Sequence, residues 1–338
     1  MLAARRITLS GVMTALVLVW PAHAADLDRY FHEGTNQVIS FNVQQFLDSV
    51  LIKKVGLDKL LAGQDSPQKL LKELDFDPLK DIERITLAGS ESDDQVVLVI
   101  QGKFNQARFK AKAEDLVEMK QRFLKIHKAD NGLIYEVTRL DELLPTPPQA
   151  KDALAPVKGK TLFVTMPDGK TLIASSSQAL AGETLDKSAG KTKSRLKNKD
   201  FAGLIAAIDA KQTLSVAMTP SKSAGLEKVT RIIGGLTLGK DLVLAVRVGA
   251  SDAEAAKDMA DTIKEQSDAI QQVLTALSTQ NQQWAPAIMT LTEILAAIKA
   301  EAKDKEIALK GTIKGETLEQ LAKVLAQAAA KAAKEEKK

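Results

Sequence analysis

An internal repeat constrains this sequence more than any single residue does. Residues 236–264 predict a strand, a tight turn, a second strand and a long helix, and residues 85–111 predict the same order. Similarity in a fixed order between two separated segments is typical of an internal duplication. We therefore expect two copies of one structural unit along the chain.

The second copy shows the pattern most clearly. Leu242, Leu244, Val246 and Val248 alternate with other residues, which places an apolar row on one face of a strand. The following segment opens with a capping box of Ser251 and Glu254, and its apolar residues then recur at helical spacing. We expect this helix to cover the apolar row.

The order of elements around each copy predicts the fold class. A strand and a helix precede each hairpin, at residues 37–55 and 212–229, and a further strand follows each long helix, near residues 124–128 and 306–314. This order is that of the ferredoxin-like, or split βαβ, unit. The sequence thus predicts an α+β protein of two tandem ferredoxin-like modules, with antiparallel sheets covered by helices. Pro286 should divide the second long helix into a helix pair.

The chain divides into four predicted segments: a signal peptide (1–24), a first α+β module (25–143), a connector (144–210) and a second α+β module with a C-terminal helix (211–338). The connector is rich in proline at its start and holds a hairpin around Pro167-Asp168-Gly169, a basic loop and helices. A second hairpin turns at Asn131-Gly132. Residues 96–100 are apolar throughout, which predicts a central strand buried on both faces.

The first residues predict export. Arg5 and Arg6, an apolar run and Ala22-His23-Ala24 form the three regions of a signal peptide cleaved after Ala24. We expect a periplasmic or secreted protein that uses the general secretory route. The twin-arginine route stays open because of the arginine pair. We expect the mature chain to be soluble, since no later segment reaches the roughly 20 apolar residues of a membrane span.

Composition excludes several classes of function. Removing residues 1–24 takes away two arginines and no acid, so the net charge falls from +4 to +2, which gives no drive toward nucleic acid. Aromatic residues make up only 4% of the chain, which argues against stacking platforms for sugars or bases. The absence of cysteine removes disulfides, thiol catalysis and cysteine-based metal sites. We expect no cofactor and no metal.

Short motifs for phosphate binding and serine catalysis do not carry their full patterns. Three Gly-Lys-Thr tripeptides begin at Gly159, Gly169 and Gly190, but none has the glycine that a P-loop needs five positions earlier. Ser-x-x-Lys occurs at Ser66, Ser188 and Ser194 without the companion elements of penicillin-recognising enzymes. Ser66 is better explained as a helix cap before Pro67.

Histidines and acidic turns are weak candidates for sites. His32 and His127 remain after cleavage, and neither has a zinc-helix partner or a nucleophile elbow nearby in sequence. Both are expected to be surface or half-buried side chains. Glu91, Asp93 and Asp94 lie in a predicted turn but lack the spacing of a calcium loop. No catalytic residue is predicted.

One local concentration of charge is the candidate binding site. No acid interrupts the stretch between Asp186 and Asp200, which could recruit an anionic polymer, a headgroup or an acidic protein. A solvated loop is the alternative interpretation. The cationic residues of this basic block are Lys187, Lys191, Lys193, Arg195, Lys197 and Lys199.

Two stretches support a resemblance to other proteins. Residues 160–185 contain a strand, a Pro-Asp turn, a Thr-Leu strand and a helix that begins among small residues, and residues 76–89 read FDPLKDIERITLAG. Together they resemble a loose group of exported bacterial proteins of unassigned function. The resemblance covers about a fifth of the chain, and its motifs concern structure and not catalysis. It implies export and transfers no catalytic residue.

These observations favour a non-catalytic envelope protein that offers sheet and helix surfaces to a protein or polymer partner. An envelope hydrolase whose carboxylates converge only in the fold is the second hypothesis. A carrier with an apolar cavity between the two modules is the third.

Overall fold

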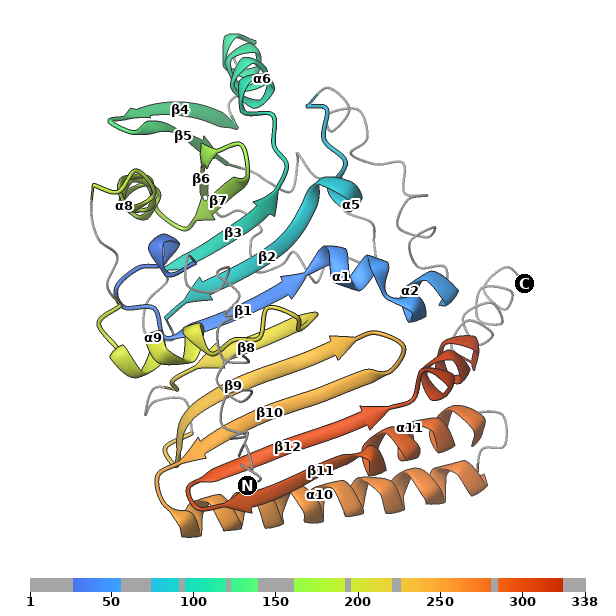
Figure 1. Cartoon of the computed structure of the whole chain (residues 1–338). Coiled ribbons are helices and arrows are strands. Elements are labelled where there is room, and N and C mark those ends of the chain that lie inside the picture. Colours follow the sequence, from blue (N-terminus) through green and yellow to red (C-terminus); the bar gives the residue numbers. More distant parts are fainter. Residues whose placement is uncertain are drawn as a thin grey trace, which may run out of the picture.

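The strands in the described part of the chain form one continuous sheet. The computed structural model describes residues 27–55, 74–90, 95–119, 123–138, 161–191, 196–220, 226–280 and 285–324. Its twelve-stranded sheet has the order β11-β12-β10-β9-β8-β1-β2-β3-β7-β6-β5-β4 (Figure 1). Every neighbouring pair of these strands is antiparallel. The predicted α+β class and antiparallel pairing are confirmed.

The elements have the following bounds. The strands are β1 (Gln37–Asn42), β2 (Ile82–Gly89), β3 (Val96–Gly102), β4 (Leu124–Ala129), β5 (Gly132–Val137), β6 (Leu162–Asp168), β7 (Thr171–Ser175), β8 (Leu214–Met218), β9 (Val229–Leu238), β10 (Leu242–Ala250), β11 (Ile298–Lys303) and β12 (Glu306–Ile313). The helices are η2 (Asp28–Tyr30), α1 (Val43–Asp48), α2 (Val50–Val55), α5 (Pro78–Asp81), α6 (Gln106–Glu118), α8 (Gln178–Ser188), α9 (Lys199–Ala206), α10 (Ala253–Gln280) and α11 (Ala285–Ala297). A further helix spans residues 315–324.

The two halves of the chain repeat one strand order on either side of the centre. Strands β1 and β8 are neighbours there, with Ser40 opposite Ser215. From this pair, β1-β2-β3 extends one way and β8-β9-β10 the other. In each half the third strand leads into a helix, α6 or α10, and the chain then forms a hairpin, β4-β5 or β11-β12. The two repeated sequence segments therefore hold corresponding places.

The strand order does not reproduce the split βαβ unit. In that unit the two strands on either side of a helix run parallel, and another strand lies between them. Here the first two strands of each half are instead direct antiparallel neighbours, β1 with β2 and β8 with β9. The predicted connector does not lie between the two halves. Its hairpin β6-β7 is instead inserted between β3 and β5. The halves meet directly through β1 and β8.

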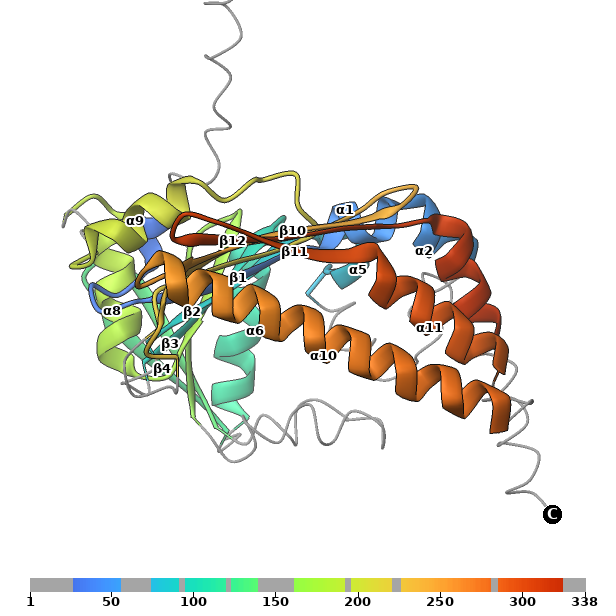
Figure 2. The ribbon, with the colours of Figure 1, turned by 90° about the horizontal axis from the view of Figure 1, so that it is seen from below.

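One face of the central strands is sealed by α9, α8 and the segment around η2. Buried residues of this face include Val38, Val99 and Ala217, which belong to the same cluster as Phe201 of α9 and Leu180 of α8. Side chains alternate along a strand, so only every second residue reaches this core. Figure 2 shows α9 on one side of the sheet and α10 on the other. We call the face beneath α9 the sealed face.

Helix α10 covers the other side, but only near one edge of the sheet. Its first turns bury Ala256 and Ala260 against Ile307 of β12 and Val248 of β10. Helix α10 was predicted to cover the apolar row of β10, but only its first turns pack on the sheet. The apolar residues farther along the helix are exposed to solvent. These exposed residues are Ile270, Val273 and Leu277.

The cap of α10 and the start of α11 can be compared with the predicted helix signals. The N-terminal cap is Asp252 rather than Ser251, since the amide of Ala255 donates to Asp252 Oδ1 over 2.7 Å. Aspartate accepts such a bond as well as serine does, so the cap lies one residue later than predicted. The predicted helix pair is confirmed, with Pro286 in the first turn of α11. Proline fits that position because the first turn needs no amide donor.

Candidate binding sites

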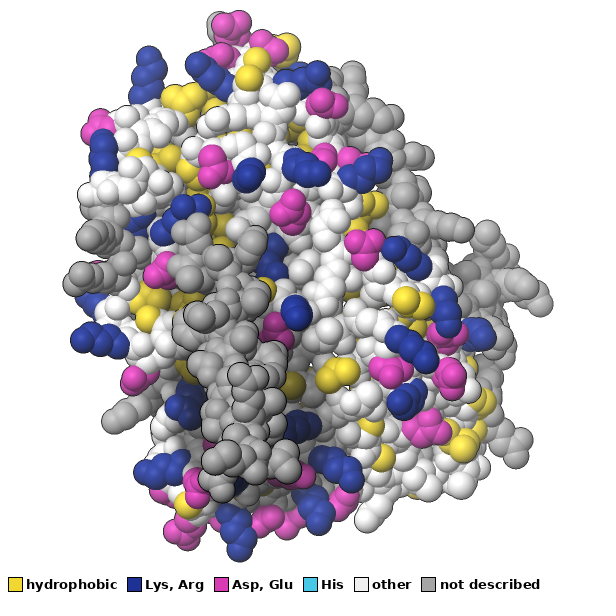
Figure 3. All heavy atoms as spheres, in the orientation of Figure 1, with side chains coloured by type: hydrophobic (Ala, Val, Ile, Leu, Met, Phe, Trp, Pro, Cys, Tyr) yellow, Lys and Arg dark blue, Asp and Glu magenta, His cyan; other side chains and the backbone are white. Residues whose placement is uncertain are grey.

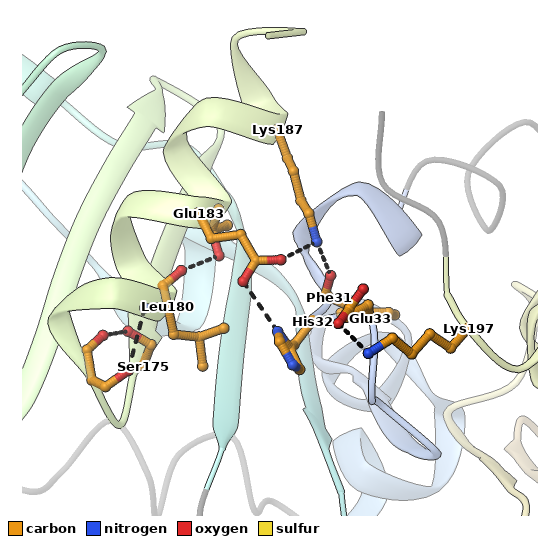
Figure 4. A network of polar contacts seen from close by, with 10 residues as sticks. Phe31, His32, Glu33, Ser175, Leu180, Glu183, Lys187 and Lys197 are labelled. Carbon is orange, nitrogen blue, oxygen red and sulfur yellow. Dashed lines mark hydrogen bonds and ion pairs between the residues drawn. The ribbon is translucent and has the colours of Figure 1, made fainter. Parts of the chain in front are cut away.

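The basic block begins with a lysine that is bound inside the protein. Lys187 lies in the last turn of α8, and its side chain is only 7% exposed. Its Nζ atom is 2.6 Å from Glu183 Oε1 and donates to the carbonyl oxygen of Phe31, also over 2.6 Å (Figure 4). The contacts fasten α8 to the segment that follows η2. Lys187 is therefore part of the internal structure.

Other described members of the block also have carboxylate partners. Lys191 Nζ lies 3.9 Å from Asp130 Oδ2, and Lys197 pairs with Glu33. Lys199 is the first residue of α9. Lys193 and Arg195 lie outside the described residues. The interpretation of the block as an anion site stays a prediction, and the ion pairs of Lys187, Lys191 and Lys197 leave it less free charge than the sequence implies.

The two histidines lie far apart in the chain, His32 in the loop after η2 and His127 in β4, and each contacts one glutamate. His32 Nδ1 is 3.1 Å from Glu183 Oε2, and His127 Nε2 is 2.7 Å from Glu136 Oε2. Hydrogen bonds from Lys125 and His127 lower the pKa of Glu136. Within the described ranges, no group of three His, Asp or Glu side chains is placed to hold a metal ion.

The serine candidates are explained by local structure or cannot be placed. Ser188 Oγ donates to the carbonyl oxygen of Thr184 over 2.7 Å, an ordinary contact within α8. Of the Gly-Lys-Thr tripeptides, the one that begins at Gly169 lies in the turn of the β6-β7 hairpin. The other serine and acidic candidates fall outside the described residues: Ser66, Ser194, Glu91, Asp93 and Asp94.

Two carboxylates of one polar hollow are each engaged by a neighbouring donor. A hollow of about 300 Å³ is lined by Asp241 and Glu319 among others. Asp241 accepts from the Gly315 amide, which lowers its pKa, and Glu319 Oε1 lies 2.6 Å from Lys54 Nζ. A general acid needs a raised pKa. Where a pKa shift is resolved for a described Asp or Glu, the shift is downward.

One surface that the sequence did not predict is the face of the central strands opposite the sealed face. Ile39 of β1 and Leu87 of β2 are direct cross-strand partners on this side, and they are 45% and 43% exposed. Their row continues through Leu98 on one side and Val216 on the other. By contrast, the adjacent residue Ala88 points to the sealed face and is 1% exposed. We call this second surface the open face.

Strand β3 has one buried face and one exposed face, and the sequence did not predict the exposed one. Val97 and Val99 are buried, but Val96 is exposed and Leu98 and Ile100 are only partly buried. The predicted burial of both faces is wrong because the helices that seal β3, α8 and α9, pack on one side. A continuous apolar strand has the same sequence signature whether its second face is covered by its own chain or by a partner.

The open face differs from the rest of the surface in its charge. The side chains of β1, β2, β3, β8, β9 and β10 that the strand register places on it are apolar or uncharged. Figure 3 shows cationic and anionic side chains interspersed on the face that is toward the viewer in Figure 1. Interspersed charge is typical of a solvated surface. The open face is thus the chemically distinctive surface.

No helix in the described part of the chain combines the length and the apolar character needed to span a membrane.

Comparisons with known proteins give a distant structural likeness only. No protein-family model matches the sequence, and the comparison with curated proteins gives no match. The chain is similar to crystal form I of TP0453, with a TM-score of 0.44 and 10% identity over 89% of this chain and 96% of that one. Crystal form III of TP0453 gives a TM-score of 0.45 and 9% identity over 88% and 97%. Identity this low assigns no role to any residue.

Proposed function

We propose that this chain is an exported, non-catalytic binding protein whose contact surface is the open face of the sheet. One observation carries the proposal: Ile39 and Leu87 are large apolar side chains at the centre of a twelve-stranded sheet, yet nearly half of each is exposed. Contiguous exposed apolar surface of this kind is typical of sites that bind another molecule.

The chemistry of the open face favours a protein partner with an apolar surface. Its side chains are mainly aliphatic and carry little charge, so an anionic polymer would find no counterions there. A small apolar ligand needs an enclosing pocket that buries most of its surface. One mainly apolar cavity, between the end of α9 and strands β1 and β2, holds only about 20 Å³ and is lined by Leu27, Ile205 and Ile208 among others. That is room for about one water molecule.

Export and duplication belong to the same proposal. The signal-peptide pattern of residues 1–24 supports an envelope location, where an apolar surface would be matched by another envelope protein. The repeated strand order on both sides of β1 and β8 supports an origin from one duplicated α+β unit. In this interpretation the open face belongs to both halves, because its central row crosses from β2 through β1 to β8.

Site-specific photo-crosslinking in cells that make the protein tests the proposed surface. A benzophenone amino acid at Leu87 should give a discrete adduct with a partner protein. The same group at Val243 is the matched control, since Val243 is 41% exposed but its side chain alternates to the other face of β10. We expect no equivalent adduct from position 243.

A second substitution makes this result specific to the open face. Ile39→Lys should abolish the adduct from position 87, because a lysine beside Leu87 would place a charge in the apolar contact. Val243→Lys should leave the adduct unchanged. Equal adducts from positions 87 and 243, or none from position 87, would contradict the proposed function.

A further inference from the structure

A second and separate site lies at the edge of the sealed face, where β1 and β3 end and β2 begins, beside α1 and α5. Figure 1 shows α1 and α5 next to these strands. The site is a polar hollow of about 400 Å³. Its lining includes three cations, Lys80, Arg84 and Lys103, together with Glu83 and three amide side chains. This polar lining differs from the aliphatic side chains of the open face and therefore suits a different ligand.

Arg84 is the central residue of the hollow. It pairs with Asn42 of β1 and Gln101 of β3, so the three side chains form one row across neighbouring strands. The strand register shifts between Ile82 and Arg84, an irregularity of the type that redirects a side chain. The row thus points polar groups into the hollow from three strands.

The guanidinium group of Arg84 is held by neutral partners. Its Nη1 donates to Ser40 Oγ over 3.3 Å, and its Nη2 donates to the carbonyl oxygen of Ala210 over 2.9 Å. These bonds fix the group but leave its charge unbalanced. Burial lowers the pKa of Arg84, and no carboxylate in the described part of the chain opposes that effect. Arginine nevertheless stays charged in proteins, so this half-buried cation favours a counterion.

The neighbouring charges leave an excess of positive charge in the hollow. Lys80 is already paired with Asp77, whose Oδ2 lies 2.7 Å from its Nζ. Neither Arg84 nor Lys103 has an ion-pair partner among the described residues. Glu83 is the one carboxylate among the described residues of the lining. Two unbalanced cations therefore face one acid.

We propose that this hollow binds a small ligand through an oxyanion group, a carboxylate or a phosphate, with Arg84 as the principal donor and Lys103 as the second cation. The planar guanidinium can donate two parallel hydrogen bonds to either group, which gives arginine its preference for such anions. The volume admits a ligand larger than the anion alone, and the amide side chains offer donors and acceptors for its neutral part.

Titration with inorganic phosphate and with acetate tests the proposal on the purified protein. At constant ionic strength set by chloride, at least one of the two anions should raise the melting temperature in a saturable way. The anion that binds tighter identifies the group, phosphate or carboxylate. If neither anion gives a saturable shift, the proposal is overturned.

Three variants connect the binding to the hollow. Arg84→Gln should weaken the anion affinity at least about tenfold, and Lys103→Gln, at an exposed position, should weaken it about threefold. The Lys103 variant keeps the test decisive if Arg84→Gln folds poorly. Arg247→Gln removes an exposed arginine of β10 and should leave the affinity unchanged. Equal effects of all three substitutions would mean that the anions bind the surface generally, which would contradict the site.

Discussion

Gly234→Ala is expected to destabilise the folded protein by about 3 kcal/mol or more. Gly234 lies in β9 with a φ of +143°, a backbone conformation that other residues rarely adopt. A Cβ atom at this position would lie 2.1 Å from the carbonyl oxygen of Ala245 in β10. Because the obstacle is backbone in a central strand, neither partner can move without breaking strand pairing. Denaturant unfolding measures the loss.

Gly203→Ala is the matched control for this prediction. Gly203 lies in α9, and a Cβ atom there would meet nothing within 4 Å. Alanine favours helix over glycine, so this variant should gain up to about 1 kcal/mol. A Gly234→Ala protein within about 1 kcal/mol of the wild type would contradict the close approach of β9 and β10.

Lys187→Met is expected to cost about 2 kcal/mol at neutral pH. The substitution leaves Glu183 without its ammonium partner and removes the bond to the Phe31 carbonyl. Removing one member of a buried ion pair costs more, but Glu183 is about one-third exposed, which reduces the penalty. Lys197→Met is the control, because the exposed Lys197–Glu33 pair should contribute less than about 1 kcal/mol.

The loss should depend on pH in a definite direction. Burial alone would raise the pKa of Glu183, but hydrogen bonds from Lys187 and His32 outweigh it, so the pKa lies below the usual 4.5. A lowered pKa in the folded state gives stability that is present above the unfolded value and lost as the pH falls. The difference between wild type and Lys187→Met should therefore shrink below about pH 4.5, as measured by denaturant unfolding. A constant difference down to pH 3 would contradict the role of Glu183.

Local sequence patterns predicted much of the fold. Both hairpins, at Asn131-Gly132 and around Asp168-Gly169, are present, as is the helix that begins at Gln178. These features depend on turn chemistry and periodicity within a few residues. The repeat was also informative, since its two copies hold corresponding places in the sheet. Segments such as 56–73 and 139–160 lie outside the described residues and leave their predicted elements untested.

Long-range pairing could not be predicted in the same way. Whether β1 lies beside β8, as the Ser40–Ser215 pair shows, depends on contacts far apart in sequence. The order of elements alone is shared by the split βαβ unit and by this sheet. The two differ only in which strands become neighbours, and local pattern does not encode that choice.

The candidate sites were harder still to predict from the sequence, because they depend on tertiary structure. The sequence pointed to the basic block, whose Lys187 is bound to Glu183. The open face was hidden because an apolar row predicts burial without naming what buries it. Arg84 stood in an ordinary strand pattern, and only the fold shows that its hydrogen-bond partners are neutral.

Thiol labelling is the most direct test of the claim that one face of the central sheet is sealed and the other open. The chain has no cysteine, so single substitutions report on single positions. Leu87 and Ala88 are adjacent in β2 but point to opposite faces, with exposures of 43% and 1%. We predict that Leu87→Cys reacts with a maleimide in the folded protein at least about a hundredfold faster than Ala88→Cys, which must wait for the sheet to open. Equal protection of the two thiols would show that the open face is covered within the folded chain and would contradict the account.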